Sequence, residues 1–140
     1  MFKYQTYFEN LSVSCPPRHY TVHNKMAFRW VFDKLNVEDS FIPVYFKNPK
    51  RFNEKSDEER CKALGLSFFE TLETAERRFI QLEKRLGREV YKTLGTQIAK
   101  GQIREEDGVN SLADSSGHFT HHPSGNFEYY KNIIIVKSLK

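Results

Sequence analysis

The sequence predicts a single α+β domain with a mostly antiparallel or mixed sheet, on which one long amphipathic helix and two shorter helices pack. The length of 140 residues is that of one ordinary domain. The 12 Phe and 7 Tyr place much of the core volume in aromatic side chains, which favours packing of helices on a sheet. Residues 71–88 have clear helical periodicity, and several other apolar runs have the length of strands.

The first third of the chain predicts strands around one buried helix. The aromatic residues within 2–8 suit an edge strand. After the break at Pro16, residues 18–23 are expected to form a short strand, because the two prolines disfavour a helix. Asn24 is a good N-cap, and it precedes residues 25–35, which are apolar around most of a helical circumference. We therefore expect a buried helix over 25–35.

The middle of the chain predicts a strand, a short helix and an inner strand. Residues 40–47 are rich in strand formers, and the proline within them favours an edge position. Ser56 and the acids after it fit a capping box that opens a helix ending before Gly65. Residues 66–70 are short and aromatic, so they should form an inner strand that delivers Thr71 as the next N-cap.

The long helix over 71–88 has two contrasting faces. Its apolar stripe recurs at helical spacing and should face the core. The stripe consists of Leu72, Ala75, Phe79, Leu82 and Leu86. The opposite face carries cations and should face solvent. These cations are Arg77, Arg78, Lys84, Arg85 and Arg88.

The last third predicts strands separated by a long loop. Residues 96–103 can form a strand, interrupted at Gly101. Residues 104–117 are polar and lack apolar periodicity, so we expect a surface loop of a length that often carries functional sites. Residues 118–122 and 131–137 should be strands.

The sequence also allows a prediction of the cellular compartment. The longest aliphatic run, 133–136, is far too short to cross a bilayer, and no signal-peptide pattern opens the sequence. These observations predict a cytoplasmic protein. Cys15 and Cys61 are the two cysteines, and two isolated cysteines in such a chain are expected to stay reduced. No cofactor is predicted, because the dinucleotide, phosphate-loop, zinc-protease and nucleophile-elbow motifs are all absent from the sequence.

Three histidines lie close together at His118, His121 and His122. The neighbouring glycine, aromatic, β-branched and proline residues favour a strand, in which His118 and His122 share one face and His121 points to the other. Histidines four residues apart on a strand are about 13 Å apart, too far to hold one ion. We therefore predict no metal site from this motif.

His19 and His23 form a second pair, beside Arg18 and Lys25. Cleavage of RNA without a metal needs one neutral imidazole, one protonated imidazole and a cation on the phosphate. If the strand carrying His118 pairs near this segment, one histidine from each could form such a dyad.

Ser67 and Glu128 are candidates for a different reaction. A glycosyl or ADP-ribosyl transfer enzyme would use a hydroxyl such as that of Ser67 to hold a ribose, and a distant carboxylate such as Glu128 to steady an oxocarbenium-like centre. A core strand followed by an N-cap explains the same residues without any catalytic role.

The basic helix face is the broadest candidate surface. Its cations would span about 16 Å, long enough to meet several phosphates, and the net charge of +4 is compatible with a polyanion partner. We expect a small cytoplasmic binding protein for RNA, DNA or another anionic partner. The alternatives are an RNA- or nucleotide-directed enzyme and an accessory subunit that contacts acidic protein. A solvated face with weak Glu73–Arg77 pairing explains the same pattern without a ligand.

Overall fold

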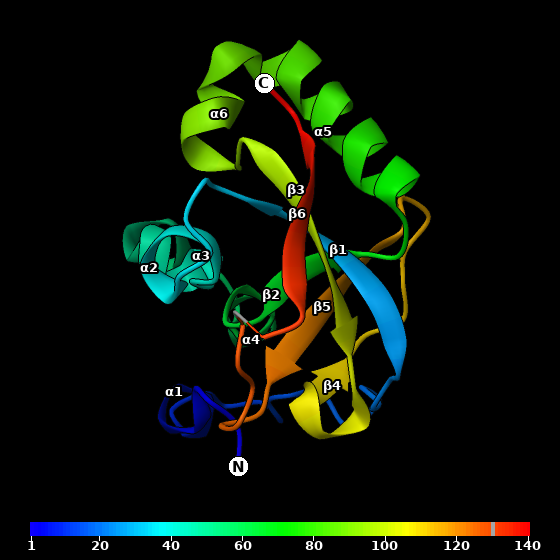
Figure 1. Cartoon of the computed structure of the whole chain (residues 1–140). Coiled ribbons are helices and arrows are strands. Elements are labelled where there is room, and N and C mark those ends of the chain that lie inside the picture. Colours follow the sequence, from blue (N-terminus) through cyan, green and yellow to red (C-terminus); the bar gives the residue numbers. More distant parts are fainter. Residues whose placement is uncertain (130) are drawn as a thin grey trace.

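The computed structural model of the chain, which describes residues 1–129 and 131–140, has an α+β fold built on one antiparallel sheet (Figure 1). The strand order is β4-β5-β2-β1-β3-β6. The strands are β1 Lys25–Val31, β2 Leu66–Phe69, β3 Gln97–Ile103, β4 Gly108–Asn110, β5 His118–Pro123 and β6 Ile133–Ser138. The α-helices are α1 Gln5–Glu9, α2 Val37–Ser40, α3 Val44–Lys47, α4 Asp57–Ala63, α5 Leu72–Leu86 and α6 Val90–Thr93. The 3₁₀ turns are η1 Pro49–Phe52, η2 Gly87–Glu89 and η3 Glu105–Asp107.

The predicted long helix is confirmed as α5, and local capping explains both of its ends. The Thr71 hydroxyl accepts a hydrogen bond from the Thr74 N–H, and the Thr74 hydroxyl in turn accepts one from the Thr71 N–H. The helix ends before Gly87, whose φ of 74° suits glycine. Ala75 and Phe79 are fully buried, as predicted, but Leu86 is 51% exposed because it lies in the last turn.

The helix predicted over 25–35 is wrong, because residues 25–31 form the central strand β1. Both faces of β1 are covered, so its apolar residues do not alternate with polar ones. Ala27 and Val31 face one core cluster, whereas Phe28 and Trp30 pack with Phe69 in the other. Pairing of all of β1 with β3 overrides the N-cap signal of Asn24.

The strands predicted before β1 are also wrong. Residues 2–8 contain the start of α1, and Phe2 contributes only an isolated bridge to Ser124. Residues 18–23 touch the sheet only at the bridge between Thr21 and Asn110. Among the aromatic residues of 2–8, Phe8 is buried but Tyr7 is 46% exposed, so aromatic content here indicates neither a strand nor uniform burial.

The strand predicted over 40–47 is replaced by two short helices, α2 and α3. Asn36 caps α2 by accepting a hydrogen bond from Asp39 N–H. Pro43 directly precedes α3, where its fixed φ suits a helix start as well as an edge strand. The other predictions for the middle and end of the chain are confirmed as α4, β2, β3, β5 and β6, although β3 runs through Gly101 without interruption and the predicted loop 104–117 contains η3 and β4.

Two clusters of apolar side chains fill the two faces of the sheet. Helix α5 covers one cluster, which contains Phe69, Ala75 and Ile98. The other face is closed by segments around Phe41 and Tyr129, whose rings stack 4.9 Å apart. Figure 1 shows α5 and α6 near the C-terminus and α1 near the opposite end of the molecule.

The expectation of reduced thiols is wrong, because Cys15 and Cys61 form a disulfide. It joins the segment between α1 and β1 to helix α4. Disulfides persist mainly in oxidising compartments, so one of the arguments for a cytoplasmic location is lost. Within residues 1–129 and 131–140, none of the helices is long and apolar enough to cross a membrane.

Candidate functional site

Strands β1 and β2 pair only at Phe28 and Phe69, and beyond this point they diverge. The Arg29 side chain lies in the gap between the diverging strands. Its Nε donates to the Ser40 carbonyl at 2.9 Å, and its Nη1 donates to the Ser67 carbonyl at 2.8 Å. Burial lowers the pKa of Arg29 to about 10, so the guanidinium is still charged at neutral pH. A half-buried cation therefore bridges the two strands where the sheet opens.

A hollow of about 250 Å³ lies at this divergence. Its wall contains three cations and one acid, together with aromatic and hydroxyl side chains. The cations are Arg29, Lys47 and Arg51, and the acid is Asp39. Desolvation, followed by the charge of Arg29, lowers the pKa of Lys47. This charge balance suits an anionic ligand.

Ser67 belongs to the wall of this hollow. The pairing of β2 with β5, in which Ser67 lies opposite Thr120, also places Ser67 on the same face of the sheet as His118. The Ser67 hydroxyl lies 2.9 Å from His118 Nε2. On the other side of the ring, His118 Nδ1 lies 3.8 Å from an Asp114 carboxylate oxygen. The order carboxylate, imidazole, hydroxyl is that of an activated serine nucleophile, although the contact to Asp114 exceeds hydrogen-bond length.

The surroundings of His118 favour its neutral form. Burial lowers its pKa, the Asp114 charge opposes this shift, and the charges of Lys62, Arg78 and Arg29 add to it. A neutral imidazole can accept the proton of the neighbouring hydroxyl. Burial alone would raise the pKa of Asp114, but hydrogen bonds from Ser116 and from the His118 N–H outweigh it and lower the pKa. Asp114 is therefore ionised at neutral pH.

The turn before β5 positions His118 beside helix α5. Asp114 Oδ1 accepts hydrogen bonds from the backbone N–H groups of Ser116 and His118. Gly117 has a φ of 79°, and an added Cβ there would lie 2.8 Å from Thr74. Only glycine allows this close approach of the turn to the first turns of α5.

The other predicted catalytic residues lie elsewhere. His23 contacts the Thr21 hydroxyl at 3.0 Å, and burial, then Lys25, lowers its pKa. His19 is exposed against the Tyr20 ring. Strand β5 pairs with β2 and β4 and does not pair with residues 18–23. Among the contacts of the described residues, no histidine dyad joins the two segments.

Glu128 is not part of the Ser67 hollow either. It forms an ion pair with Lys131 at 2.8 Å and lines a separate hollow with residues of β3 and β6. Asp114 and Arg29, by contrast, were not predicted as site residues. The Asp-x-x-x-His spacing of residues 114–118 is the one local signal for Asp114, whereas the position of Arg29 depends on where β1 and β2 diverge.

The cations of α5 lie on its outward face, as predicted. Arg77, Lys84 and Arg85 are exposed and Arg78 is half-buried, whereas the exposed Arg88 follows the helix in η2. None of them forms an ion pair within residues 1–129 and 131–140, and the predicted Glu73–Arg77 pair is not among the salt bridges of these residues. Two acids of the helix are already occupied, because Glu76 pairs with Lys137 and Glu83 accepts from the Tyr91 hydroxyl.

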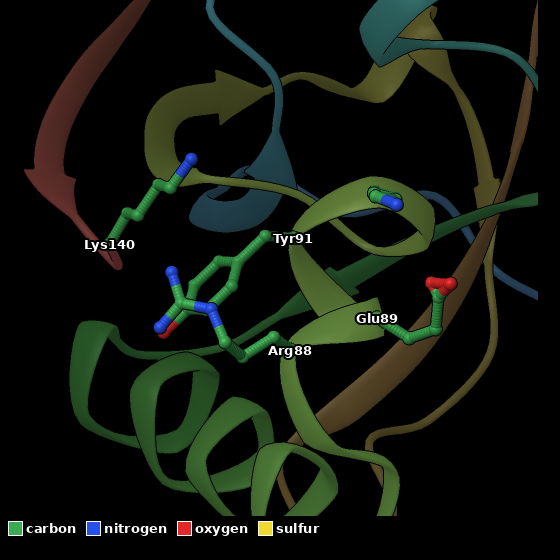
Figure 2. Close-up of a pocket in the computed structure, with 5 residues that line it drawn as sticks. Arg88, Glu89, Tyr91 and Lys140 are labelled. Atoms are coloured by element: carbon green, nitrogen blue, oxygen red, sulfur yellow. The ribbon is translucent and has the colours of Figure 1, made fainter.

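Beyond the C-terminal end of α5, a second hollow of about 450 Å³ surrounds Tyr91 (Figure 2). The Arg88 guanidinium lies 5.5 Å and the Lys140 ammonium 5.9 Å from the centre of the Tyr91 ring. Lys92 and Glu89 complete the lining, and the Glu89 carboxylate points away from the ring. The basic face of α5 therefore continues onto an aromatic ring that has two cations within 6 Å of its centre.

In comparisons with known proteins, no family model, no curated protein and no solved structure matches this chain.

Proposed function

We propose that this protein binds a polyanion, with RNA or DNA as the first candidate, through the outward face of α5 and the hollow around Tyr91. The observation that carries the proposal is the availability of these cations. The cations of α5 form no ion pairs among the described residues, and two of the helix's acids are occupied by Lys137 and Tyr91. Exposed guanidiniums without an ion-pair partner can make bidentate contacts to phosphate.

The position of Tyr91 adds a second contribution. Single-stranded nucleic acids bind where cations that follow the backbone are accompanied by an aromatic ring on which bases stack. Arg88 and Lys140 flank the Tyr91 ring, and Lys92 lies in the same hollow. A single strand that follows α5 would meet this ring after the cations of the helix, so we expect single-stranded RNA or DNA to bind more tightly than duplex.

Charge reversal on α5 tests this function. Changing Arg77, Arg78 and Arg85 to Glu is expected to weaken binding of a labelled single-stranded oligonucleotide by at least about 100-fold at low salt. The logarithmic salt dependence should also become shallower by about two units, since roughly three phosphate contacts are lost. Fluorescence anisotropy over a range of salt concentrations measures both quantities.

A matched control distinguishes binding at the α5 surface from a general effect of the net charge. Arg18, Lys34 and Lys50 are exposed and lie outside α5, so changing them to Glu alters the net charge equally. This control should retain most of the affinity. Equal loss in both triple variants, or no oligonucleotide binding by the unaltered protein, would contradict the proposal. Salt-sensitive binding of an acidic protein alone would favour the accessory-subunit alternative.

A second candidate function is supported by the contact between Ser67 and His118. In this function, Ser67 Oγ attacks a phosphate ester held by Arg29, Lys47 and Arg51, and His118 accepts the hydroxyl proton. The new Oγ–P bond forms as the P–O bond to the leaving alcohol breaks, and the proton passes from His118 to that alcohol. Water then releases the phosphate from Ser67 by the reverse proton transfer.

Substitution of Ser67 and His118 tests the enzyme function. With bis(p-nitrophenyl) phosphate or RNA as substrate, Ser67→Ala and His118→Gln should each lower kcat/KM at least about 100-fold. The control His23→Gln alters a histidine outside the contact and should keep the activity. Turnover that survives Ser67→Ala in the folded protein would exclude this mechanism.

A further inference from the structure

A histidine lies beside the disulfide, namely His122 of β5. Cys15, Cys61 and His122 each place one potential metal-ligand atom within 4.8 Å of the other two. The three residues come from the segment after α1, from helix α4 and from strand β5. Two sulfurs and an imidazole nitrogen are a ligand set that zinc prefers.

A hydrogen bond fixes the tautomer of the His122 ring. His122 Nε2 lies 2.8 Å from the Cys61 carbonyl oxygen, which can only accept, so Nε2 carries the hydrogen. Nδ1 of the neutral ring then has a free lone pair. Nδ1 is buried and has no hydrogen-bond partner among the described residues. A buried acceptor without a partner is costly, and in metal sites it is the atom that coordinates the ion.

The surroundings hold the ring in place. The Tyr20 ring stacks on His122 at 5.5 Å, and the Phe8 ring meets its edge at 5.2 Å. His122 and Cys61 are buried, whereas Cys15 is half-buried. Donation from the second ring nitrogen to a backbone carbonyl is the usual way in which proteins orient a metal-ligating histidine. Access from solvent remains on the Cys15 side.

We propose that reduction of the Cys15–Cys61 disulfide converts this cluster into a zinc site formed by the two thiolates and the His122 imidazole. The disulfide accepts two electrons and two protons from a dithiol or phosphine reductant, which is oxidised in turn. Binding of Zn²⁺ then displaces the two thiol protons. Water from the Cys15 side takes the fourth position.

The geometry requires little movement. In a tetrahedral zinc site with Zn–S bonds of about 2.3 Å, the two sulfurs are about 3.8 Å apart. Two reduced sulfurs must separate to roughly this contact distance in any case. Because the ligand atoms already lie within 4.8 Å, side-chain adjustments suffice and the fold around His122 stays in place.

Cobalt binding by the full chain tests the site. After anaerobic reduction and removal of the reductant, titration with Co²⁺ should produce thiolate-to-metal charge-transfer bands and the visible bands of tetrahedral cobalt, and Zn²⁺ should abolish both. The oxidised protein should bind Co²⁺ at least about 100-fold more weakly, because a disulfide offers no thiolate. Reduced, folded protein that produces no such bands would overturn the proposal.

Variants keep the test decisive. Cys15→Ser removes one thiolate at the half-buried position, where loss of folding is least expected, and should weaken Co²⁺ binding at least about 100-fold. His122→Asn should weaken binding while both thiolates remain, whereas the control His23→Gln should bind as the unaltered protein does. Circular dichroism shows which variants are folded. Full-strength binding by folded Cys15→Ser would contradict the proposal, as would a melting temperature of the reduced protein that Zn²⁺ fails to raise.

Discussion

Replacing Cys15 and Cys61 together by Ala is expected to lower the free energy of unfolding by about 4 kcal/mol. The two cysteines are 46 positions apart, and a cross-link of that span removes about this much loop-closure entropy from the unfolded chain. Between Glu9 and Lys25 the chain has no regular helix or strand of its own, and the disulfide is a covalent link from this segment to the rest of the fold. Urea unfolding of the oxidised protein and of the double variant measures the difference.

A nearby contact provides the control for the disulfide. Ser12 joins the same segment to α4, because its N–H and its hydroxyl both donate to Asp57, at 2.8 and 2.7 Å. These hydrogen bonds, followed by that from Arg60, lower the pKa of Asp57 to about 2. Ser12→Ala should cost only about 1 kcal/mol. A double cysteine variant no less stable than Ser12→Ala would show that the disulfide contributes far less to stability than loop closure predicts.

Lowering the pH from 7 to 4 is expected to remove about 3 kcal/mol from the free energy of unfolding through His121 alone. Burial, then the charges of His122, Arg29 and His23, lowers the pKa of His121 from 6.5 to about 3 in the folded protein. The unfolded chain therefore binds a proton below pH 6.5 that the folded protein still rejects at pH 4. Stability is greatest above pH 6.5 and falls as the pH drops towards 3.

The structure around His121 explains the size of this shift. The ring is fully buried between Phe68 and Phe127, and its Nδ1 lies 2.7 Å from Asn110 Oδ1. Asn110 is a neutral partner and cannot compensate a positive ring. Burial also lowers the pKa of His122, so its contribution has the same sign.

Urea unfolding at several pH values checks the acid sensitivity. His121→Gln should be less stable at pH 7, because a buried hydrogen bond and packing are disturbed, yet it should lose less stability on acidification. The control His19→Gln changes an exposed histidine and should keep the dependence of the unaltered protein. An unchanged pH dependence in His121→Gln would exclude His121 as its source.

Where local chemistry alone specifies an element, prediction from sequence succeeded. The Thr71 cap and the apolar spacing of Leu72, Ala75 and Phe79 led to α5, and Ser56 led to α4. The alternation along β5 is also confirmed, because His121 packs on Phe68 whereas His118 contacts Phe69 on the other face. These features depend on residues within a few positions of one another.

Central elements and contacts between distant segments were not predictable. The sequence of β1 resembles a buried helix, because a strand covered on both faces has no polar side to reveal its period of two. Its state is decided by pairing with β3, about 70 residues later in the chain. The same limit hid the Cys15–Cys61 disulfide, since two cysteines 46 positions apart carry no mark of their proximity.

The candidate sites also contain some features that the sequence predicted and others that only the tertiary structure decided. The sequence alone predicted most of the basic face of α5, because Arg77, Arg78, Lys84 and Arg85 lie on one helix. It also identified Ser67 and His118 as polar residues of two strands. The tertiary structure decided that these two side chains meet at 2.9 Å, that Arg88 and Lys140 both lie near the Tyr91 ring, and that His122 lies beside the two sulfurs. A helix specifies its faces through spacing along the chain, whereas contacts between separate strands and loops exist only once the sheet has fixed which segments are neighbours.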